Sequence, residues 1–454
     1  MNRPLPRRAL AALLAGILLM AAALSGCSKK IGVVGYHKGD MLTLAWLAQE
    51  DMYMHFWDDQ NNHIVKTDQG YAIPDSQRQT IIWDQAMMAF EMYTLWQATD
   101  DQTIKDRLTA QWAFVKGNFT QAQLIGNFSN PPNIAVDDAG WDAMALVLYY
   151  QASGDTYALQ VVKALIQNAY DYYKDGDTAN GLWYPQYPPS SASGASKTDN
   201  RFKSLYDVGL VAAALEFQLI TGDQDLFADT LNVYNWMETN LCRDAVKTYP
   251  DGRSGGGDFT VNTVDYLYWC DFNVGRTGRQ EATGPDGGLR PTDIREANSV
   301  SSLMGNMAMG VIQARLYRIT GDQKYLDLAL RTVNAINNEK SPYYNNGVYY
   351  NDRDAWTNAA FMGPWVSEVL ALPGIQTRDT DHILRTAQSI GLNCRTADGY
   401  WRAEWAGGNA WEALWAKTGA SNPFPGHYTQ IMTSANTVGT LTAAALLEKQ
   451  LYPK

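Results

Sequence analysis

The 454-residue sequence has few cysteines and histidines, the residues that hold most metals and disulfide frameworks. It contains 4 Cys and 5 His, with no Cys-x-x-Cys, His-x-x-x-His or His-Glu-x-x-His spacing. Zinc sites depend on such spacings, so we expect neither a metal nor a cofactor. Cys242, Cys270 and Cys394 lie far apart, and the sequence alone leaves open whether any two of them form a disulfide.

Charged residues are also sparse, at 18% of the chain, and basic ones are the rarer kind. The formal net charge is −11, and it becomes −14 without residues 1–26, which contribute only Arg3, Arg7 and Arg8. A chain this acidic repels phosphate backbones, so we expect no nucleic-acid partner. The 15 Trp, 26 Tyr and 12 Phe are abundant by contrast. Flat apolar rings stack on sugar faces, although they also fill cores.

Long apolar runs are confined to the N-terminus. A basic start, Met1 to Arg8, precedes an apolar stretch from Ala9 to Leu24, which is about 16 residues and too short to span a bilayer. Leu24-Ser25-Gly26-Cys27 follows and resembles the bacterial lipobox. We therefore expect a lipoprotein signal peptide at 1–26, lipidation of Cys27, and a tether at 27–40. The protein would be extracytoplasmic, on the outer membrane or cell surface, and would contact the membrane through its lipid anchor only.

Strand-like alternation is scarce from residue 41 onward, and apolar residues recur at helical spacing instead. No linker interrupts this part of the chain, so we expect one catalytic domain over 41–454. The spacing predicts helices near 41–57, 81–98, 101–117, 139–152, 155–173, 203–220, 223–240, 297–319, 322–338, 355–371, 378–393 and 430–449.

Short turns of one kind join several of these helices. Gly154-Asp155, Gly222-Asp223 and Gly321-Asp322 are three examples, and Asp100-Asp101 holds the equivalent place in a fourth. Glycine ends a helix in the left-handed conformation, and aspartate caps the next one. Turns this short make the two helices antiparallel neighbours. Their irregular spacing excludes a fixed-period solenoid and favours an all-α toroid of six helix pairs, an (α/α)6 barrel. Its long loops, 175–202, 244–296 and 341–354, would line one mouth.

The strongest candidates for catalysis are two adjacent acids, Asp137 and Asp138, at the start of an apolar helix. Helix capping explains one of them and leaves the second as surplus. Adjacent carboxylates at a partly desolvated mouth resist ionising together, so the pKa of one rises while that of the other stays low. Glycoside hydrolysis uses one charged and one protonated carboxyl group. Trp141, one helical turn further along, can stack on a sugar there.

The Asp-Asp pair with Trp141, followed by Tyr149-Tyr150-Gln151-Ala152-Ser153-Gly154-Asp155, resembles glycoside hydrolase family 76. Similar segments continue over most of the mature chain: Asn180-Gly181-Leu182-Trp183-Tyr184, the Thr-Gly-Asp turns and, more loosely, Phe361-Met362-Gly363-Pro364. That family comprises endo-α-1,6-mannanases and related fungal wall enzymes, and its members are (α/α)6 barrels. The resemblance implies cleavage of α-1,6 bonds in α-mannan or manno-oligosaccharides.

The same resemblance implies a retaining double displacement, with Asp137 as nucleophile and Asp138 as acid/base. The chain departs from the family pattern at Ser204, Met362 and Ser367, so some polar contacts with the substrate should differ. Besides Trp141, the candidates for substrate contacts are Asn133, Trp183, Tyr184, Lys203, Asp207 and Trp365, most of which can equally be turn, cap or core residues.

Two other functions fit parts of the sequence. One is a surface lipoprotein that binds glycans without turnover, which needs no paired carboxylates. The other is a different (α/α)6 enzyme, such as an unsaturated glucuronyl hydrolase or a sugar epimerase. Epimerases depend on histidines, which are few here, and glucuronyl hydrolases act on anionic substrates, which suit an acidic chain less well. We expect a monomer.

Overall fold

The structure is a computed structural model. It describes residues 37–60, 62–64, 82–126, 136–182, 184–185, 201–244, 264–268, 271–272, 303–341, 343–345, 347–349, 358–402, 405 and 431–453. The chain divides into two compact units, Met1–Asp40 and Met41–Lys454, and the second unit carries the helical domain. The predicted signal peptide, Cys27 and most of the predicted tether lie outside the described residues. None of the described helices combines the length and apolar character that a bilayer crossing requires.

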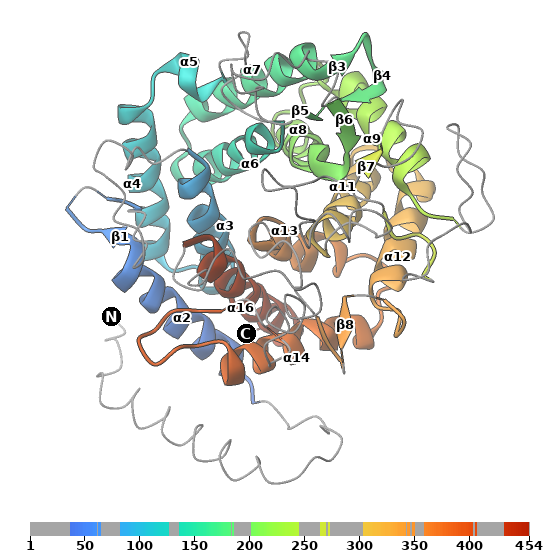
Figure 1. Ribbon diagram of the computed structural model, residues 1–454. Helices are drawn as coiled ribbons and strands as arrows, with labels where there is room; N and C mark the ends of the chain where they lie inside the picture. Colours follow the sequence, from blue (N-terminus) through green and yellow to red (C-terminus); the bar gives the residue numbers. More distant parts are fainter. Residues whose placement is uncertain are drawn as a thin grey trace, which may run out of the picture. The chain divides into compact units, whose positions relative to one another are not determined.

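Six helical segments form a closed inner ring (Figure 1). Each packs against the next in chain order, and the last packs against the first. They are α3 (Ile82–Thr99), α6 (Val136–Ser153), α8 (Val208–Thr221), α11 (Leu303–Thr320), α13 (Asn358–Pro364) with its π-helical continuation η3 (Trp365–Val369), and α16 (Ile431–Leu451).

Six outer helices surround this ring (Figure 1). They are α2 (Asp40–Phe56), α4 (Gln102–Asn118), α7 (Thr156–Tyr173), α9 (Phe227–Leu241), α12 (Gln323–Ile336) and α14 (Thr377–Asn393). Five of them pack against inner helices: α4 on α3 and α6, α7 on α6 and α8, α9 on α8, α12 on α11, and α14 on α16. In α2, Gln49 donates to Glu91 of α3 at 3.4 Å. The arrangement confirms the (α/α)6 barrel, and each predicted helix corresponds to one of these elements.

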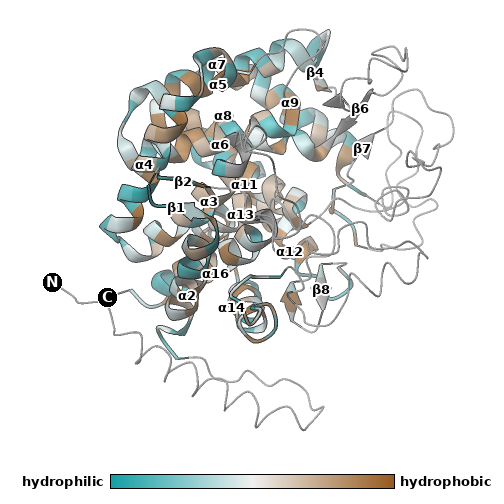
Figure 2. Cartoon of the chain, turned by 60° about the vertical axis from the view of Figure 1, so that its left-hand side comes forward, coloured by the Kyte–Doolittle hydropathy of each residue, from teal (hydrophilic) through white to brown (hydrophobic). Residues whose placement is uncertain are grey.

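Inner and outer helices differ in how much of their surface they bury. Every residue of α11 from Leu303 to Leu316 is buried. In α4, only the five residues Ile104, Leu108, Gln111, Trp112 and Val115 are buried. A helix that is apolar all round belongs in the interior, and one with a single apolar stripe belongs on the surface. In Figure 2 the outer helices α2, α4 and α7 accordingly carry hydrophilic residues among their hydrophobic ones.

The turns within helix pairs follow the predicted chemistry in three places. Gly154 and Gly321 have φ angles of 73° and 69°, in the left-handed region. Asp155 and Asp322 then cap α7 and α12, each accepting at 3.0 Å from the backbone N–H two residues later. In the first turn Asp100 itself is left-handed, with φ of 58°, and the next residue caps α4.

The turn after α8 differs from its prediction. Gly222 ends α8 with φ of 72°, as expected. Asp223, however, accepts from the N–H of Asp225 at 2.9 Å, and α9 starts only at Phe227. The predicted start at 223 was therefore early, because the aspartate closes a local turn there before the helix begins.

Short antiparallel strands lie in the connections that lead from an outer helix to the next inner one. The two-stranded pairs are β1 (Trp57–Asp58) with β2 (His63–Ile64), β3 (Lys174–Asp175) with β4 (Asp177–Leu182), and β8 (Tyr344–Asn345) with β9 (Val348–Tyr349). One sheet has three strands, β5 (Tyr184–Pro185), β6 (Arg201–Ser204) and β7 (Asp271–Phe272). Residues 203–207, predicted as helix, are the end of β6 and the 3-10 turn η2 (Leu205–Asp207). A short helix, α5 (Gln121–Leu124), follows α4.

Candidate active site

Asp137 and Asp138 occupy the first turn of α6, and both side chains are half-buried. The beginning of an inner helix lies at the mouth that receives the long connections, whereas the short turns of the helix pairs lie at the other mouth. The pair therefore lies at the mouth where sequence analysis expected a binding site.

A close contact between glycines holds the starts of α6 and α8 together. A Cβ atom added to Gly140 would stand 2.9 Å from Gly209 Cα and 2.7 Å from the backbone nitrogen of Leu210. Only glycine permits this approach, because any side chain would have to displace main-chain atoms. Packing of α6 against η2 then brings the start of α6 close to Asp207, which is fully buried directly before α8.

Tyr173 joins these acids from the end of α7. The helices α6 and α7 have 18 residues each and are joined by a short turn, so the end of α7 returns to the start of α6. Burial raises the pKa of Tyr173 above its ordinary value, and Tyr172, Asp137, Asp138 and Asp207 raise it further. The hydroxyl thus stays protonated beside three carboxyl groups. We call Asp137, Asp138, Asp207 and Tyr173 the aspartate cluster.

Tyr173 was not among the site residues predicted from the sequence. The signal was nevertheless present, because two antiparallel helices of equal length must place the last residue of the second beside the first turn of the first.

The structure corrects the predicted roles of two tryptophans. Trp141 is 2% exposed, with its ring packed edge-on against Phe361 at a centroid distance of 5.9 Å. Trp365 is 0% exposed and covers Gly310, where an added Cβ would lie 2.6 Å from the ring. Neither ring has a face open to a sugar. The reason is that inner helices of a closed ring are buried all round, so their aromatic residues fill the interior.

The remaining predicted contacts are placed only in part. Tyr184 lies in β5 opposite Phe202, and Lys203 lies in β6 opposite Phe272. Because β6 runs directly into η2, this sheet borders Asp207 in the chain. Asn133 and Trp183 lie outside the described residues. Among the described residues there is no group of His, Cys, Asp or Glu that could hold a metal ion. Cys242 and Cys394 are buried, and Cys270 is not among the described residues.

No sequence family model matches the chain, and no curated protein is similar to it in sequence. Solved structures, in contrast, match it almost from end to end. A family 76 glycoside hydrolase (mannosidase) from Bacteroides thetaiotaomicron VPI-5482 superimposes with a TM-score of 0.62 at 15% identity, covering 91% of this chain and 100% of the other. The chain has the fold of glycoside hydrolase family 76.

Two further structures support this assignment of the fold. An α-1,6-mannanase of Salegentibacter sp. HEL1_6 matches with a TM-score of 0.59 at 15% identity, over 90% of this chain and 100% of that protein. That structure is an inactive variant with two consecutive aspartates replaced by asparagine, in complex with α-1,6-mannotriose. A Chaetomium thermophilum protein in complex with glucosamine matches with a TM-score of 0.58 at 14% identity, over 91% and 92% of the two chains.

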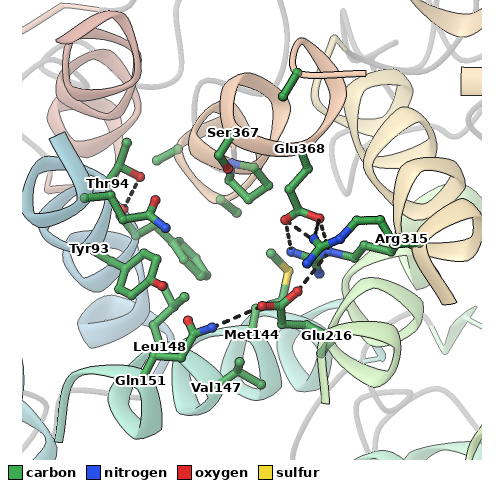
Figure 3. Close-up of a pocket in the computed structure, with 18 of the residues that line it drawn as sticks. Tyr93, Thr94, Met144, Val147, Leu148, Gln151, Glu216, Arg315, Ser367 and Glu368 are labelled. Carbon is green, nitrogen blue, oxygen red and sulfur yellow. Dashed lines mark hydrogen bonds and ion pairs between the residues drawn. The ribbon is translucent and has the colours of Figure 1, made fainter. Parts of the chain in front are cut away.

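Described residues also line a pocket toward the mouth opposite the aspartate cluster. A pocket of about 520 Å³ lies among α3, α6, α8, α11, α13 and η3, and reaches from the middle of α3, α6 and α8 to their C-terminal ends (Figure 3). The α6 residues that line the pocket run from Met144 to Gln151, 6 to 13 positions or about 9–20 Å along the helix beyond Asp138, and no residue of the aspartate cluster lines it. The pocket is therefore separate from the aspartate cluster.

A buried ion cluster forms one side of this pocket. Arg315 donates to both carboxylate oxygens of Glu368, at 2.7 to 3.2 Å, and to the carbonyl of Ala212 at 2.7 Å. Its Nε also lies 3.3 Å from Glu216, which accepts from Gln151 at 3.1 Å. These residues were not among those predicted from the sequence. An arginine inside an almost entirely apolar helix was the available signal, since such a charge needs buried partners.

Proposed function

We propose that this protein is a retaining glycoside hydrolase that cleaves α-1,6-mannosidic bonds in mannan outside the cell. The observation that carries the proposal is the adjacent pair Asp137 and Asp138, half-buried where α6 begins. It is supported by the shared fold and by the Salegentibacter mannanase, whose inactive variant lacks two consecutive aspartates.

The proposed chemistry has two steps. Asp137 attacks the anomeric carbon while Asp138 protonates the departing glycosidic oxygen, and a mannosyl ester of Asp137 forms. Asp138, now a carboxylate, then takes a proton from water, which attacks the anomeric carbon and releases Asp137. Each aspartate ends the cycle in the protonation state in which it began.

The other two members of the aspartate cluster suit this cycle. Asp207 brings a third carboxyl group, fully buried, next to the start of α6. Tyr173 keeps its proton, because burial and the neighbouring acids raise its pKa. It therefore offers a neutral hydroxyl that can donate a hydrogen bond to a carboxylate.

The test of catalysis uses Asp137→Asn and Asp138→Asn with linear α-1,6-mannan, and the readout is the release of oligosaccharides. Each variant should lose at least about a hundredfold in rate. Asp106→Asn on the outer surface of α4 is the matched control and should retain full activity. Unchanged rates in both site variants would end the proposal, and tight binding without turnover by the unmodified protein would indicate a glycan-binding protein instead.

Azide separates the two roles. In Asp137→Ala, azide replaces the missing nucleophile and should give a mannosyl azide of inverted configuration. In Asp138→Ala, azide attacks the glycosyl-enzyme ester and should give the retained configuration. The opposite assignment of products would exchange the two roles.

We also propose that the protein is anchored to the membrane through a lipid on Cys27. The basis is the signal-like start of the sequence and the Leu-Ser-Gly-Cys motif. Cys27→Ser should move the protein from the membrane fraction to the soluble fraction without changing its rate on short substrates. Retention in the membrane fraction after this change would refute lipid anchoring at Cys27.

A further inference from the structure

The pocket at the mouth opposite the aspartate cluster has no part in the proposed hydrolysis. We call it the rear pocket and define it by six side chains that face one open space in Figure 3: Tyr93, Gln151, Glu216, Arg315, Ser367 and Glu368. Its volume of about 520 Å³ lies within the range of ordinary small-molecule sites, roughly 300–1,000 Å³.

The charges in the rear pocket balance. Glu216 and Glu368 face Arg315, and Glu368 also accepts from Arg318 at 3.2 Å. Two carboxylates and two guanidinium groups leave no net charge, so neither an anion nor a cation has a preferred place. A neutral ligand fits this balance.

The polar groups of the rear pocket offer both donors and acceptors. Gln151 donates to Glu216 at 3.1 Å and Ser367 to the carbonyl of Gly363 at 3.0 Å, so the second amide hydrogen of Gln151 and the side-chain oxygens of both residues are the groups that a ligand could use. Burial raises the pKa of Tyr93, and Glu216 and Glu368 raise it further, so its hydroxyl keeps its proton. A ligand with several hydroxyl groups matches this mixture, because each hydroxyl both donates and accepts.

Apolar side chains supply the other wall. Met144, Val147 and Leu148 come from α6, the helix that also carries Gln151, and line the rear pocket (Figure 3). The C–H faces of a sugar ring pack on such surfaces while its hydroxyls bond to polar neighbours.

The rear pocket is also held in shape before any ligand arrives. Arg315 joins α8, α11 and η3 through its bonds to Ala212 and Glu368. Ser367 and Glu368 belong to the π-helical segment η3, and such segments are frequent at functional sites. A wall fixed in this way lowers the ordering cost of binding.

We propose that the rear pocket is a second saccharide-binding site, which takes one or two neutral sugar units. The site is separate from the aspartate cluster, and its existence does not depend on hydrolysis. Its expected role, which rests on the proposed mannan substrate, is to hold a mannose unit or short mannoside at the end of the barrel remote from the acids.

The test uses the Asp137→Asn/Asp138→Asn variant with 3-fluorotyrosine at position 93, observed by fluorine NMR. Mannose or α-1,6-mannobiose should shift this resonance saturably, and glucuronate and spermidine should not. No saturable shift with either sugar would refute the proposal. A shift produced by the charged probes alone would refute it as well.

Two further variants show whether the signal comes from the rear pocket. Leu148→Trp fills the pocket and should abolish the shift, and Gln151→Leu should weaken binding about tenfold. If Leu148→Trp does not fold, Gln151→Leu decides alone, and unchanged affinity there overturns the proposal. In the otherwise unmodified protein, Gln151→Leu should leave the rate of hydrolysis of short substrates unchanged. The binding proposal and the proposed enzyme activity can therefore fail independently of each other.

Discussion

Gly140 of α6 lies against Gly209 of α8, so closely that a Cβ at Gly140 would come within 2.9 Å of Gly209 Cα. Asp137 and Asp138 lie less than one helical turn before Gly140, and Asp207 lies two residues before Gly209. The contact therefore sets how close the acids of the two helices come to one another.

Gly140→Ala should damage both stability and activity. The new methyl group meets main-chain atoms that cannot rotate away, which costs about 1–3 kcal/mol of folding free energy. It also moves α6 away from α8 and so separates Asp138 from Asp207. Thermal unfolding and hydrolysis rates measure the two effects.

The matched control for this change is Gly117→Ala. Gly117 lies in α4 with nothing within 4 Å of an added Cβ. Alanine there should stabilise the protein by about 0.4–1 kcal/mol and leave activity intact. Equal behaviour of the two variants would contradict a special role for the α6–α8 contact.

Tyr173→Phe should change the pH dependence of hydrolysis. A hydroxyl that donates to a carboxylate stabilises its charged form, so loss of the donor raises the pKa of that carboxylate. Because the nucleophile must be charged, the acidic limb of the kcat/KM profile should move to higher pH. The control is Tyr157→Phe, near the other end of α7, which should leave the kcat/KM profile unchanged. An unchanged profile in Tyr173→Phe would contradict the prediction and mean that the Tyr173 hydroxyl only fills space.

Glu91→Gln should stabilise the protein at neutral pH. Glu91 is fully buried, and burial raises its pKa well above the ordinary value of 4.5. The folded state therefore keeps a proton that the unfolded state loses, so stability falls as pH rises from 4.5 through the folded-state pKa.

Glutamine has nearly the same shape as glutamate and never ionises, so Glu91→Gln removes this pH-dependent loss of stability. The gain should be on the order of 1 kcal/mol or more at pH 7 and near zero at pH 4. Thermal unfolding at the two pH values measures it. Glu50→Gln, on the exposed side of α2, should change neither value, and a gain at pH 4 equal to that at pH 7 would argue against the ionisation mechanism.

Arg315→Leu should be strongly destabilising. It leaves Glu216 and Glu368 without their buried counter-ion, which costs roughly 3–5 kcal/mol. Arg318 contacts the same Glu368 but is 49% exposed, so Arg318→Ala should cost no more than about 1 kcal/mol. Chemical denaturation of the two variants gives the comparison, and similar losses would mean that the position of the charge is unimportant.

The sequence by itself determined the helices and their pairing. Apolar residues at helical spacing place α3, α4, α6 and α7 within a few residues, because that pattern reports directly which face is buried. The turn residues Gly154 and Asp155 act through their own backbone and nearest neighbours, so their roles are also readable locally. The predicted start of α9 at 223 failed because Asp223 can close a turn as readily as it caps a helix.

Only the tertiary structure decided which side chains meet. Asp207 and Tyr173 come to Asp137 and Asp138 from distant positions in the chain, through a glycine contact and an antiparallel return that no local pattern specifies. Burial of Trp141 and the pairing of Arg315 with Glu368 likewise follow from closure of the ring. Helical periodicity fixes a side chain's direction around its own axis, whereas its neighbours depend on how six helices pack around a common centre.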